Sequence, residues 1–279
     1  MLLYKYLTPE RTDVLHNKSI RLTQINLLND PFEYIINVSA EKKTMAEYLH
    51  KHRLNELKAE VFRQNPYLTQ ISNTIDWKNQ IEAFCTHDTL HELIHWENVL
   101  ENVINKISSH GGVLSMTEDR NNNLMWSHYA MEHTGFVVGF DTSTPMIEGG
   151  GFKPVSYQDE TVRMHFTKVE EIEDVRAHEK SKDKEYWMSA MYVKSTDWSY
   201  EKEWRLTGPF SLCKEVKPLV YLLPFDPRSV KEIILGCRVS TETEEKIRKL
   251  LAQDKQLEHV ELYRAKKDPR KFQLIIEPC

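Results

Sequence analysis

The sequence predicts an α+β fold in which a mixed, mainly antiparallel sheet forms the core and carries an inserted helical lobe. Segments rich in β-forming residues and helical segments follow one another without the regular strand–helix alternation of a parallel α/β sheet. A long, charged stretch of amphipathic periodicity over residues 40–110 interrupts them, with few glycines or prolines. We therefore expect one elaborated domain over residues 1–279, with residues 40–110 as a helical insertion.

The first elements are defined by β-forming composition and by capping signals. The opening run LLYKYL (residues 2–7) is predicted to be a strand, and Thr8-Pro9 can start a short helix from Pro9 to about Asn17. The alternation of Ile20, Leu22 and Gln24 predicts a second strand. Regular structure then breaks at Asn29-Asp30-Pro31, because a residue before proline avoids helical angles and Asp30 suits an Asx turn.

The middle of the chain alternates strands with one short helix. VLSMTED (113–119) after Gly111-Gly112 is strand-like, Asn121 to Asn123 form a turn, and a helix from Leu124 to about Gly135 precedes the buried strand GFVVGF. We expect a helix in the charged stretch 168–191. The later expected elements are PVSY (154–157), WSYEKEWRLTGPF (198–210), LVYLLPFDP (219–227), VKEIILGC (230–237) and HVELYRAKK (259–267) as strands, and TETEEKIRKLLAQ (241–253) as a helix.

Composition limits the class of protein. Apolar residues make up 40% and aromatic residues 10%, which indicates a folded chain. The formal net charge of −5 provides no global basic field, so nucleic-acid binding would need a local patch. The four cysteines form no CxxC pair, which argues against a thiolate zinc site. No apolar run has the length of a signal peptide or a membrane helix, and we expect a cytoplasmic protein without membrane contacts.

Two short segments carry polar groups that a core alone would not require. Trp126, Ser127, His128 and Tyr129 are consecutive on a helix, so at least two of them face something polar. In the segment 198–210, a strand period of two places Glu201, Glu203 and Arg205 on one face. The alternative interpretation of that face is a solvated surface with a cross-pair salt bridge worth under about 1 kcal/mol.

The segment His91-Glu92-Leu93-Ile94-His95 has the formal HExxH pattern of zinc peptidases, in which two histidines one helical turn apart bind the metal. The surrounding helix is charged, and no third histidine follows at the spacing of a metzincin. We therefore interpret it as a surface turn of a charged helix and assign no metal ligand.

Four segments together resemble the bacterial family catalogued as domain of unknown function 2971. They are LYKY, LNDPFE, LMWSHYAMEHTGFVVGFD, and the spaced residues Lys194, Trp198, Glu201, Glu203 and Arg205. The resemblance extends from Leu3 to about Gly236, with residues 40–110 as its variable part. The family name implies no chemistry.

A more distant similarity is to ADP-ribosyltransferase folds, which share the opening strand, helix and strand and a late strand bearing Glu-x-Glu. The resemblance implies that a first-strand residue holds the adenosine half of NAD, that aromatic residues hold the nicotinamide, and that the late glutamate binds the ribose. The chain departs from the pattern because Lys5 replaces a histidine or arginine, and Arg21-Leu22-Thr23-Gln24 replaces a Ser-Thr-Ser triplet. We assign NAD contacts to Lys5, Tyr6, Asn29, Asp30, Trp126, His128, Tyr129 and Arg205.

By this resemblance we expect an enzyme that cleaves NAD, either an ADP-ribosyltransferase or an NAD glycohydrolase, acting as a toxin or phage-defence effector. Glu203 and Glu201 are the predicted catalytic residues, because a carboxylate stabilises the positive charge that develops on the ribose. The macromolecular acceptor is left open, nucleic acid included. The alternatives are a non-catalytic ligand sensor, or a metal-dependent hydrolase that uses Asp30, Glu33, Glu201 and Glu203, or the His91–His95 motif.

Overall fold

The computed structural model describes residues 1–146, 150–177 and 189–279. Its contacts divide the chain into two compact units: unit 1 comprises Met1–Phe32, Ile107–Asp159 and Lys194–Cys279, and unit 2 comprises Glu33–Lys106 and Glu160–Val193. Unit 2 thus takes in most of the predicted insertion at 40–110 and, in addition, a later segment. This division into compact units does not test the predicted single domain over residues 1–279, which stays a prediction.

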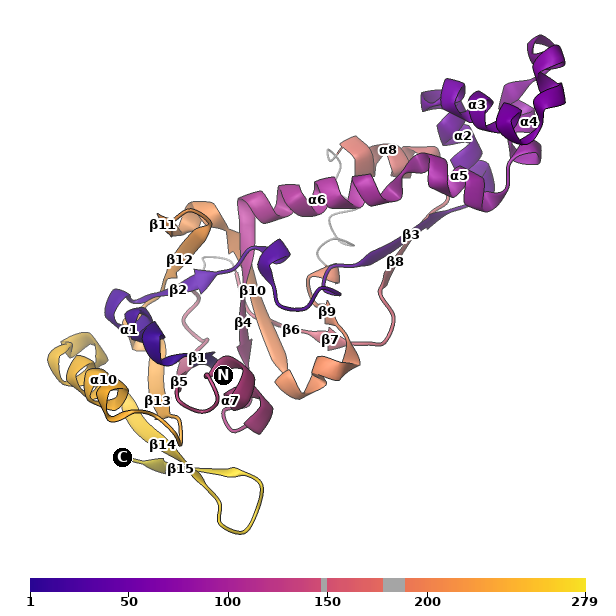
Figure 1. The fold of residues 1–279 in the computed structure, drawn as a ribbon. Coiled ribbons are helices and arrows are strands. Elements are labelled where there is room, and N and C mark those ends of the chain that lie inside the picture. Colours follow the sequence, from indigo (N-terminus) through magenta and orange to yellow (C-terminus); the bar gives the residue numbers. More distant parts are fainter. Residues whose placement is uncertain (147–149, 178–188) are drawn as a thin grey trace. The chain divides into compact units, whose positions relative to one another are not determined.

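Unit 1 is built on an eight-stranded sheet, which confirms the predicted mixed, mainly antiparallel α+β fold (Figure 1). Only β13 and β14 run parallel, and every other neighbouring pair is antiparallel. In spatial order the strands are β15 (Leu274–Pro278), β14 (Glu261–Lys267), β13 (Val230–Leu235), β5 (Phe136–Asp141), β1 (Leu2–Leu7), β4 (Gly111–Thr117), β10 (Glu203–Pro209) and β6 (Lys153–Pro154).

The central strands β1 and β5 have apolar cores on both faces. The run from Phe136 to Phe140 in β5 is buried throughout, as its continuous apolar sequence predicts. Strand β1 alternates, with Leu3 and Leu7 in one core and Tyr4 and Tyr6 in another. Helix α10 (Thr241–Gln253) contributes Ile247 to the first of these cores.

The short elements of unit 1 largely follow the sequence signals. The predicted first helix is confirmed as η1 (Pro9–Thr12) and α1 (Asp13–Asn17), and the second strand as β2 (Ser19–Leu22), which forms a three-stranded sheet with β12 (Val220–Pro224) and β11 (Lys214–Lys217). The remaining short elements are η2 (Ile25–Leu27), β7 (Ser156–Tyr157), η4 (Thr196–Glu201), η5 (Phe210–Leu212), η6 (Pro227–Ser229) and η7 (Lys255–Leu257).

Helix α7 (Asn123–Tyr129) is shorter than the helix predicted to end near Gly135. The side chain of Asn122 caps it by accepting hydrogen bonds from the backbone amides of Leu124 and Met125. After Tyr129 the chain leaves the helix, and three consecutive residues, Met131 to His133, have left-handed φ angles. Gly135 follows where a Cβ atom would lie 2.0 Å from the carbonyl oxygen of Leu7, which only glycine permits.

The strand predicted over residues 198–210 is wrong in its first third. Residues Thr196–Glu201 form the 3₁₀ turn η4, Lys202 has a left-handed φ of 43°, and β10 begins only at Glu203. The serine at position 195 caps this turn by accepting from the backbone amide of Asp197, a local arrangement that competes with an extended chain.

Unit 2 packs helices around a short parallel pair of strands, β3 (Ile36–Ala40) and β8 (Val162–Phe166). Its helical elements are α2 (Lys42–His52), α3 (Leu54–Gln64), η3 (Pro66–Thr74), α4 (Trp77–Phe84), α5 (His87–Ile94), α8 (Val169–Ala177) and, as far as Lys106, α6 (Trp96–His110). Buried Met45, Leu49, Leu57 and Ile81 lie in its core. Part of the helix predicted over 168–191 falls at residues 178–188, outside the described residues. No described helix is long and apolar enough to cross a membrane.

Candidate functional site

Four charged side chains of unit 1 are almost completely buried next to one another. Relative exposures are 5% for Lys194, 3% for Glu201, 5% for Glu203 and 1% for Arg205. They come from β9 (Val193–Lys194), η4 and β10. Charged side chains are rarely buried to this extent without partners, because removing an ion from water costs several kcal/mol. Each of the four is therefore expected to have specific partners.

Glu203 and Arg205 lie on one face of β10 and form a two-pronged ion pair. Arg205 donates from Nε to Oε1 of Glu203 at 2.7 Å and from a terminal nitrogen to Oε2 at 3.0 Å. Strand β4 places Ser115 opposite Arg205, and the Ser115 side chain also donates to Glu203. Burial alone would raise the pKa of Glu203, but the charge and hydrogen bonds of Arg205, together with Lys194, lower it to about 2.

Lys194 joins the two carboxylates. Its Nζ lies 2.6 Å from Oε2 of Glu201 and 3.3 Å from Oε2 of Glu203, and 4.7 Å from the centre of the Trp198 ring. The backbone carbonyl of Lys194 accepts a hydrogen bond from the amide of Gln158, which ties it to the end of β7. The lysine thus occupies a fixed position between two negative charges and one aromatic face.

Glu201 is held on its other side by Tyr129 of α7. The Tyr129 hydroxyl donates to Oε1 of Glu201 at 2.5 Å, and it accepts a bond from the side-chain amide of Asn29 at 3.2 Å. Burial and the adjacent Glu201 charge hold the pKa of Tyr129 well above its usual range, so the phenol stays protonated as a donor.

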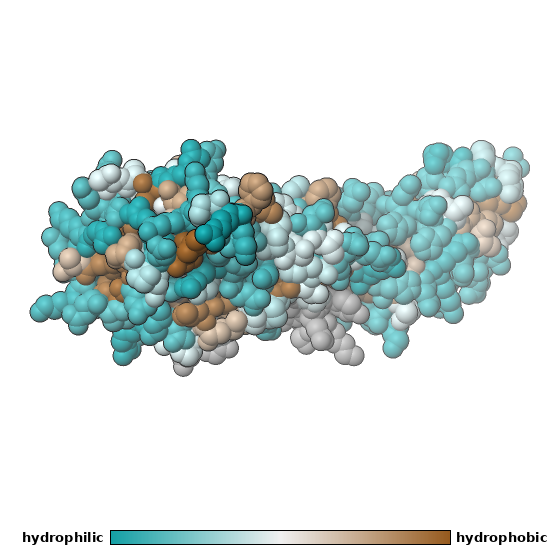
Figure 2. Space-filling view, turned by 90° about the horizontal axis from the view of Figure 1, so that it is seen from below, coloured by the Kyte–Doolittle hydropathy of each residue, from teal (hydrophilic) through white to brown (hydrophobic). Residues whose placement is uncertain are grey.

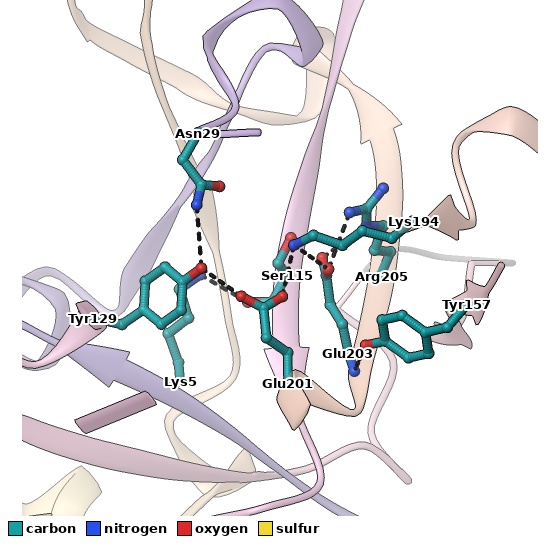
Figure 3. Close-up of polar contacts among 9 residues, drawn as sticks. All are labelled: Lys5, Asn29, Ser115, Tyr129, Tyr157, Lys194, Glu201, Glu203 and Arg205. Carbon is teal, nitrogen blue, oxygen red and sulfur yellow. Dashed lines mark hydrogen bonds and ion pairs between the residues drawn. The ribbon is translucent and has the colours of Figure 1, made fainter. Parts of the chain in front are cut away.

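Two further side chains complete the cluster. The Lys5 ammonium donates to the backbone carbonyl of Ser115 at 2.7 Å, and burial lowers its pKa to about 8, despite the opposing effect of the Glu203 charge. The Tyr157 hydroxyl accepts a hydrogen bond from the backbone amide of Glu203 at 2.8 Å, and burial raises its pKa to about 12. Figure 3 shows these contacts together, with the side chains of all nine residues converging from several elements of unit 1.

Most of the site residues predicted from the sequence belong to this cluster. The structure brings together Lys5, Asn29, Tyr129, Glu201, Glu203 and Arg205. The sequence interpretation did not assign a site role to Lys194, Ser115 or Tyr157. One sequence feature could have identified Lys194 as a site residue, since its spacing to Glu201 is part of the family resemblance. Ser115 had a weaker one as a polar residue within the apolar run VLSMT.

Four other predicted site residues make different contacts. The Tyr6 hydroxyl donates to the backbone carbonyl of Asp119. Trp126 is 0% exposed, because its large ring fills the core beneath α7 and packs edge-to-face on Tyr6. Its ring N–H donates a hydrogen bond to the backbone carbonyl of Arg120. His128 is exposed, and its ring lies edge-to-face with the Tyr129 ring, with 6.3 Å between the ring centroids. Asp30 accepts from the amide of Phe32, which is the Asx turn that its sequence context predicted.

The His91–His95 motif does not have the geometry of a zinc peptidase. Helix α5 ends at Ile94, and His95 has a left-handed φ of 54°, so the two histidines do not share one face of a continuous helix. The Nε2 atom of His91 is hydrogen-bonded to the carbonyl of Val38 at 2.9 Å. Across the three described stretches of the chain, no group of three or more His, Cys, Asp or Glu residues could hold a metal ion.

The cluster combines fixed charges with one carboxylate that keeps hydrogen-bond acceptor capacity. With Lys5, Lys194 and Arg205 charged, the set carries one positive charge more than Glu201 and Glu203 neutralise, and a neutral Lys5 makes the set neutral overall. Each oxygen of Glu201 accepts one of the bonds given above, and a carboxylate oxygen has two lone pairs. Glu201 can therefore accept a further hydrogen bond, whereas Glu203 is engaged by Arg205, Lys194 and Ser115.

Fold and site together define an α+β protein with an ion-paired polar cluster buried in the sheet unit. Residues 125–206 match a family described as protein of unknown function DUF2971. The matched segment carries six residues of the cluster: Tyr129, Tyr157, Lys194, Glu201, Glu203 and Arg205. The resemblance to this family, predicted over most of the chain, is thus shown for residues 125–206. No curated protein and no solved structure matches the chain.

Proposed function

We propose that the buried cluster is the active site of an enzyme that cleaves NAD between nicotinamide and ribose. The substrate class comes from the distant resemblance to ADP-ribosyltransferase folds. The cluster supports the bond cleavage itself, because it provides a fixed carboxylate. Breaking this bond places positive charge on the ribose, so a carboxylate fixed nearby stabilises the transition state more than the bound substrate. The ADP-ribose would pass to water or to a macromolecular acceptor.

The position of Glu201 is the observation that carries this proposal. Tyr129 and Lys194 hold its two oxygens at 2.5 and 2.6 Å, so the carboxylate is oriented before any substrate binds. A charge fixed inside a protein acts through a lower dielectric than water, and no reorganisation is required during the reaction. The acceptor capacity left on Glu201 suits a hydrogen bond from a ribose hydroxyl.

The roles of the two glutamates then differ from those expected from the sequence, where Glu203 bound the ribose. We assign substrate contact to Glu201, and we assign to Glu203 the positioning of Lys194 through the ion pair with Arg205. The partly exposed Tyr129 ring suits contact with the planar leaving group. Lys5 would neutralise one phosphate of the NAD pyrophosphate.

Release of nicotinamide from NAD by the purified protein, followed by chromatography, tests this proposal. Glu201→Gln keeps the size of the side chain but removes its charge, and we expect turnover to fall at least about a hundredfold. The matched control is Glu232→Gln, which changes a buried glutamate that Arg120 holds at 2.9 Å outside the cluster. That control should lose stability and keep turnover. Equal turnover by Glu201→Gln and the wild type would reject the proposal.

One observation favours a second candidate function, a ligand-sensing module without catalysis. Both carboxylates are already neutralised by cations in the ligand-free protein, and such a network can serve as a rigid support for a binding surface. The same purified protein separates the two functions. A rise in melting temperature with NAD, in the absence of nicotinamide release with or without added cellular protein and nucleic acid, would support the sensor and reject the enzyme.

Growth of cells that express the protein gives a second readout of the enzymatic proposal. Unrestrained NAD cleavage depletes the cofactor, so expression of the wild type should lower cellular NAD and arrest growth, as expected of a toxin or phage-defence effector. The Glu201→Gln variant should do neither at the same expression level. Growth arrest by both proteins, with NAD unchanged, would contradict this function.

A further inference from the structure

The tip of the C-terminal hairpin is a basic loop on a chain that is acidic overall. Residues 266–273 comprise the end of β14 and its connection to β15, and they include four cations and one acid: Lys266, Lys267, Arg270, Lys271 and Asp268. The loop projects beyond the sheet of unit 1 (Figure 1, yellow). Lys267, Arg270 and Lys271 are exposed to solvent, so their charges are available to a partner.

An aromatic ring stands among these cations. Phe272 is fully exposed, at 104% of its reference surface. Figure 2, seen from the side toward which the tip points in Figure 1, shows a mostly hydrophilic surface with small, separate apolar patches. A fully exposed phenylalanine contributes nothing to the core, which makes it a candidate contact for a partner.

Internal hydrogen bonds order the loop that presents this ring. Asp268 accepts from the backbone amide of Arg270 at 2.8 Å and from the side chain of Gln273 at 2.9 Å, and its own amide donates to the carbonyl of Gln273. The tip is therefore a structured turn, and a partner would bind it with a smaller entropy cost than a free loop requires.

The loop is also attached to the helix that contributes to the candidate site. Asn123, the first residue of α7, donates to the backbone carbonyl of Phe272 at 2.8 Å, and Asn121 donates to that of Leu274. Tyr129 lies six residues further along α7, a rise of about 9 Å. A molecule held at the tip would thus lie within a few helical turns of the cluster.

We propose that the hairpin tip binds single-stranded nucleic acid. Such a partner offers what the tip can recognise, since a base can stack on the ring of Phe272 while the backbone phosphates contact Lys267, Arg270 and Lys271. A single exposed aromatic ring near three exposed cations in the sequence suits alternating bases and phosphates better than a bilayer, which favours a broader apolar face. This inference is independent of whether the cluster cleaves NAD.

Fluorescence anisotropy with a labelled 20-nucleotide strand of mixed sequence, at several salt concentrations, tests the proposal on the full chain. Phe272→Ala should weaken binding by about tenfold. The double variant Arg270→Glu with Lys271→Glu should weaken it by at least about tenfold and flatten its salt dependence. Its matched control, Lys246→Glu with Lys249→Glu, changes net charge equally on exposed positions of α10 and should leave binding unchanged.

The results that would overturn the proposal are distinct. The proposal would be overturned if the wild type failed to bind the strand at low salt. It would also be overturned if the α10 control weakened strand binding as much as the tip variant does, which would indicate a nonspecific effect of charge. Binding to vesicles of phosphatidylcholine and phosphatidylserine that depends on Phe272, with strand binding unaffected by Phe272→Ala, would assign the tip to membranes instead. The melting temperature of each variant should match the wild type, since every altered residue is exposed.

Discussion

The hydroxyl of Tyr129 donates a hydrogen bond to Glu201 across 72 residues of sequence, with 2.5 Å between the two oxygens. The bond links helix α7 to the turn η4, two elements that a local reading of the sequence treats separately. It also holds the one carboxylate in the cluster that keeps acceptor capacity. The geometry of the candidate site therefore depends on this contact.

We predict that Tyr129→Phe lowers the free energy of unfolding by about 2 kcal/mol, because a hydrogen bond to a charged group contributes about 1.5–3 kcal/mol. Urea denaturation measures this. The matched control is Tyr263→Phe, which removes a similar bond from Tyr263 to Glu261 at 2.6 Å on the protein surface. Solvent replaces that bond, so stability should stay unchanged. If both variants lost the same free energy of unfolding, the Tyr129 hydrogen bond would stabilise the protein no more than a surface hydrogen bond does.

Lys194→Met is expected to be more damaging. It leaves two buried carboxylates next to each other without their shared cation, and breaking a buried ion pair costs about 3–5 kcal/mol. Adding Glu201→Gln should recover part of this loss, since one of the unpaired charges disappears. A double-mutant cycle by urea denaturation gives the coupling free energy. If the losses of stability from Lys194→Met and Glu201→Gln were additive, the shared network would be contradicted. The control is Lys266→Met, which removes an exposed ion pair and should have little effect on stability.

Local patterns in the sequence predicted the parts of the fold that depend on local chemistry. The apolar run of β5 and the helix predicted over 241–253, which is α10, are of this kind. The order of the strands in the sheet, by contrast, does not depend on local chemistry. Nothing near residue 5 indicates that β1 lies between β4 and β5, because that neighbourhood depends on pairing over more than a hundred residues.

The candidate site was predictable in part for the same reason. A period of two correctly placed Glu203 and Arg205 on one face of β10. Glu201 also faces the cluster, but through the left-handed Lys202 and not through a strand, so its predicted placement rested on the wrong element. The segment around Trp126 was recognised as unusual, yet sequence alone does not tell which ring points into the core and which toward a site.

A pH dependence follows from the lowered pKa of Lys5. Its pKa is about 8 in the folded protein, against 10.5 ordinarily, because burial disfavours the charged form. Between these values the unfolded chain binds more protons than the folded protein, so the stability of the wild type should rise with pH. Relative to Lys5→Met, the wild type should gain stability as pH increases from about 8 to 10.5, as urea denaturation across this range would show. A difference in stability that does not vary with pH would contradict the burial of this charge.

The backbone after Tyr129 provides the last prediction. Met131, Glu132 and His133 have φ angles of 46°, 53° and 67°, and left-handed angles cost a residue with a side chain roughly 1–2 kcal/mol. Glu132 is exposed, so Glu132→Gly should relieve strain without removing a core contact.

After the entropy cost of glycine, we expect the free energy of unfolding to rise by about 0.5–1 kcal/mol. Glu132→Ala removes the same side chain but keeps the Cβ atom, and it should give no such gain in a thermal melt. If the strain also holds Tyr129 toward Glu201, the more stable glycine variant should release less nicotinamide than the alanine variant. Equal stability of the two variants would show that the left-handed segment carries no strain.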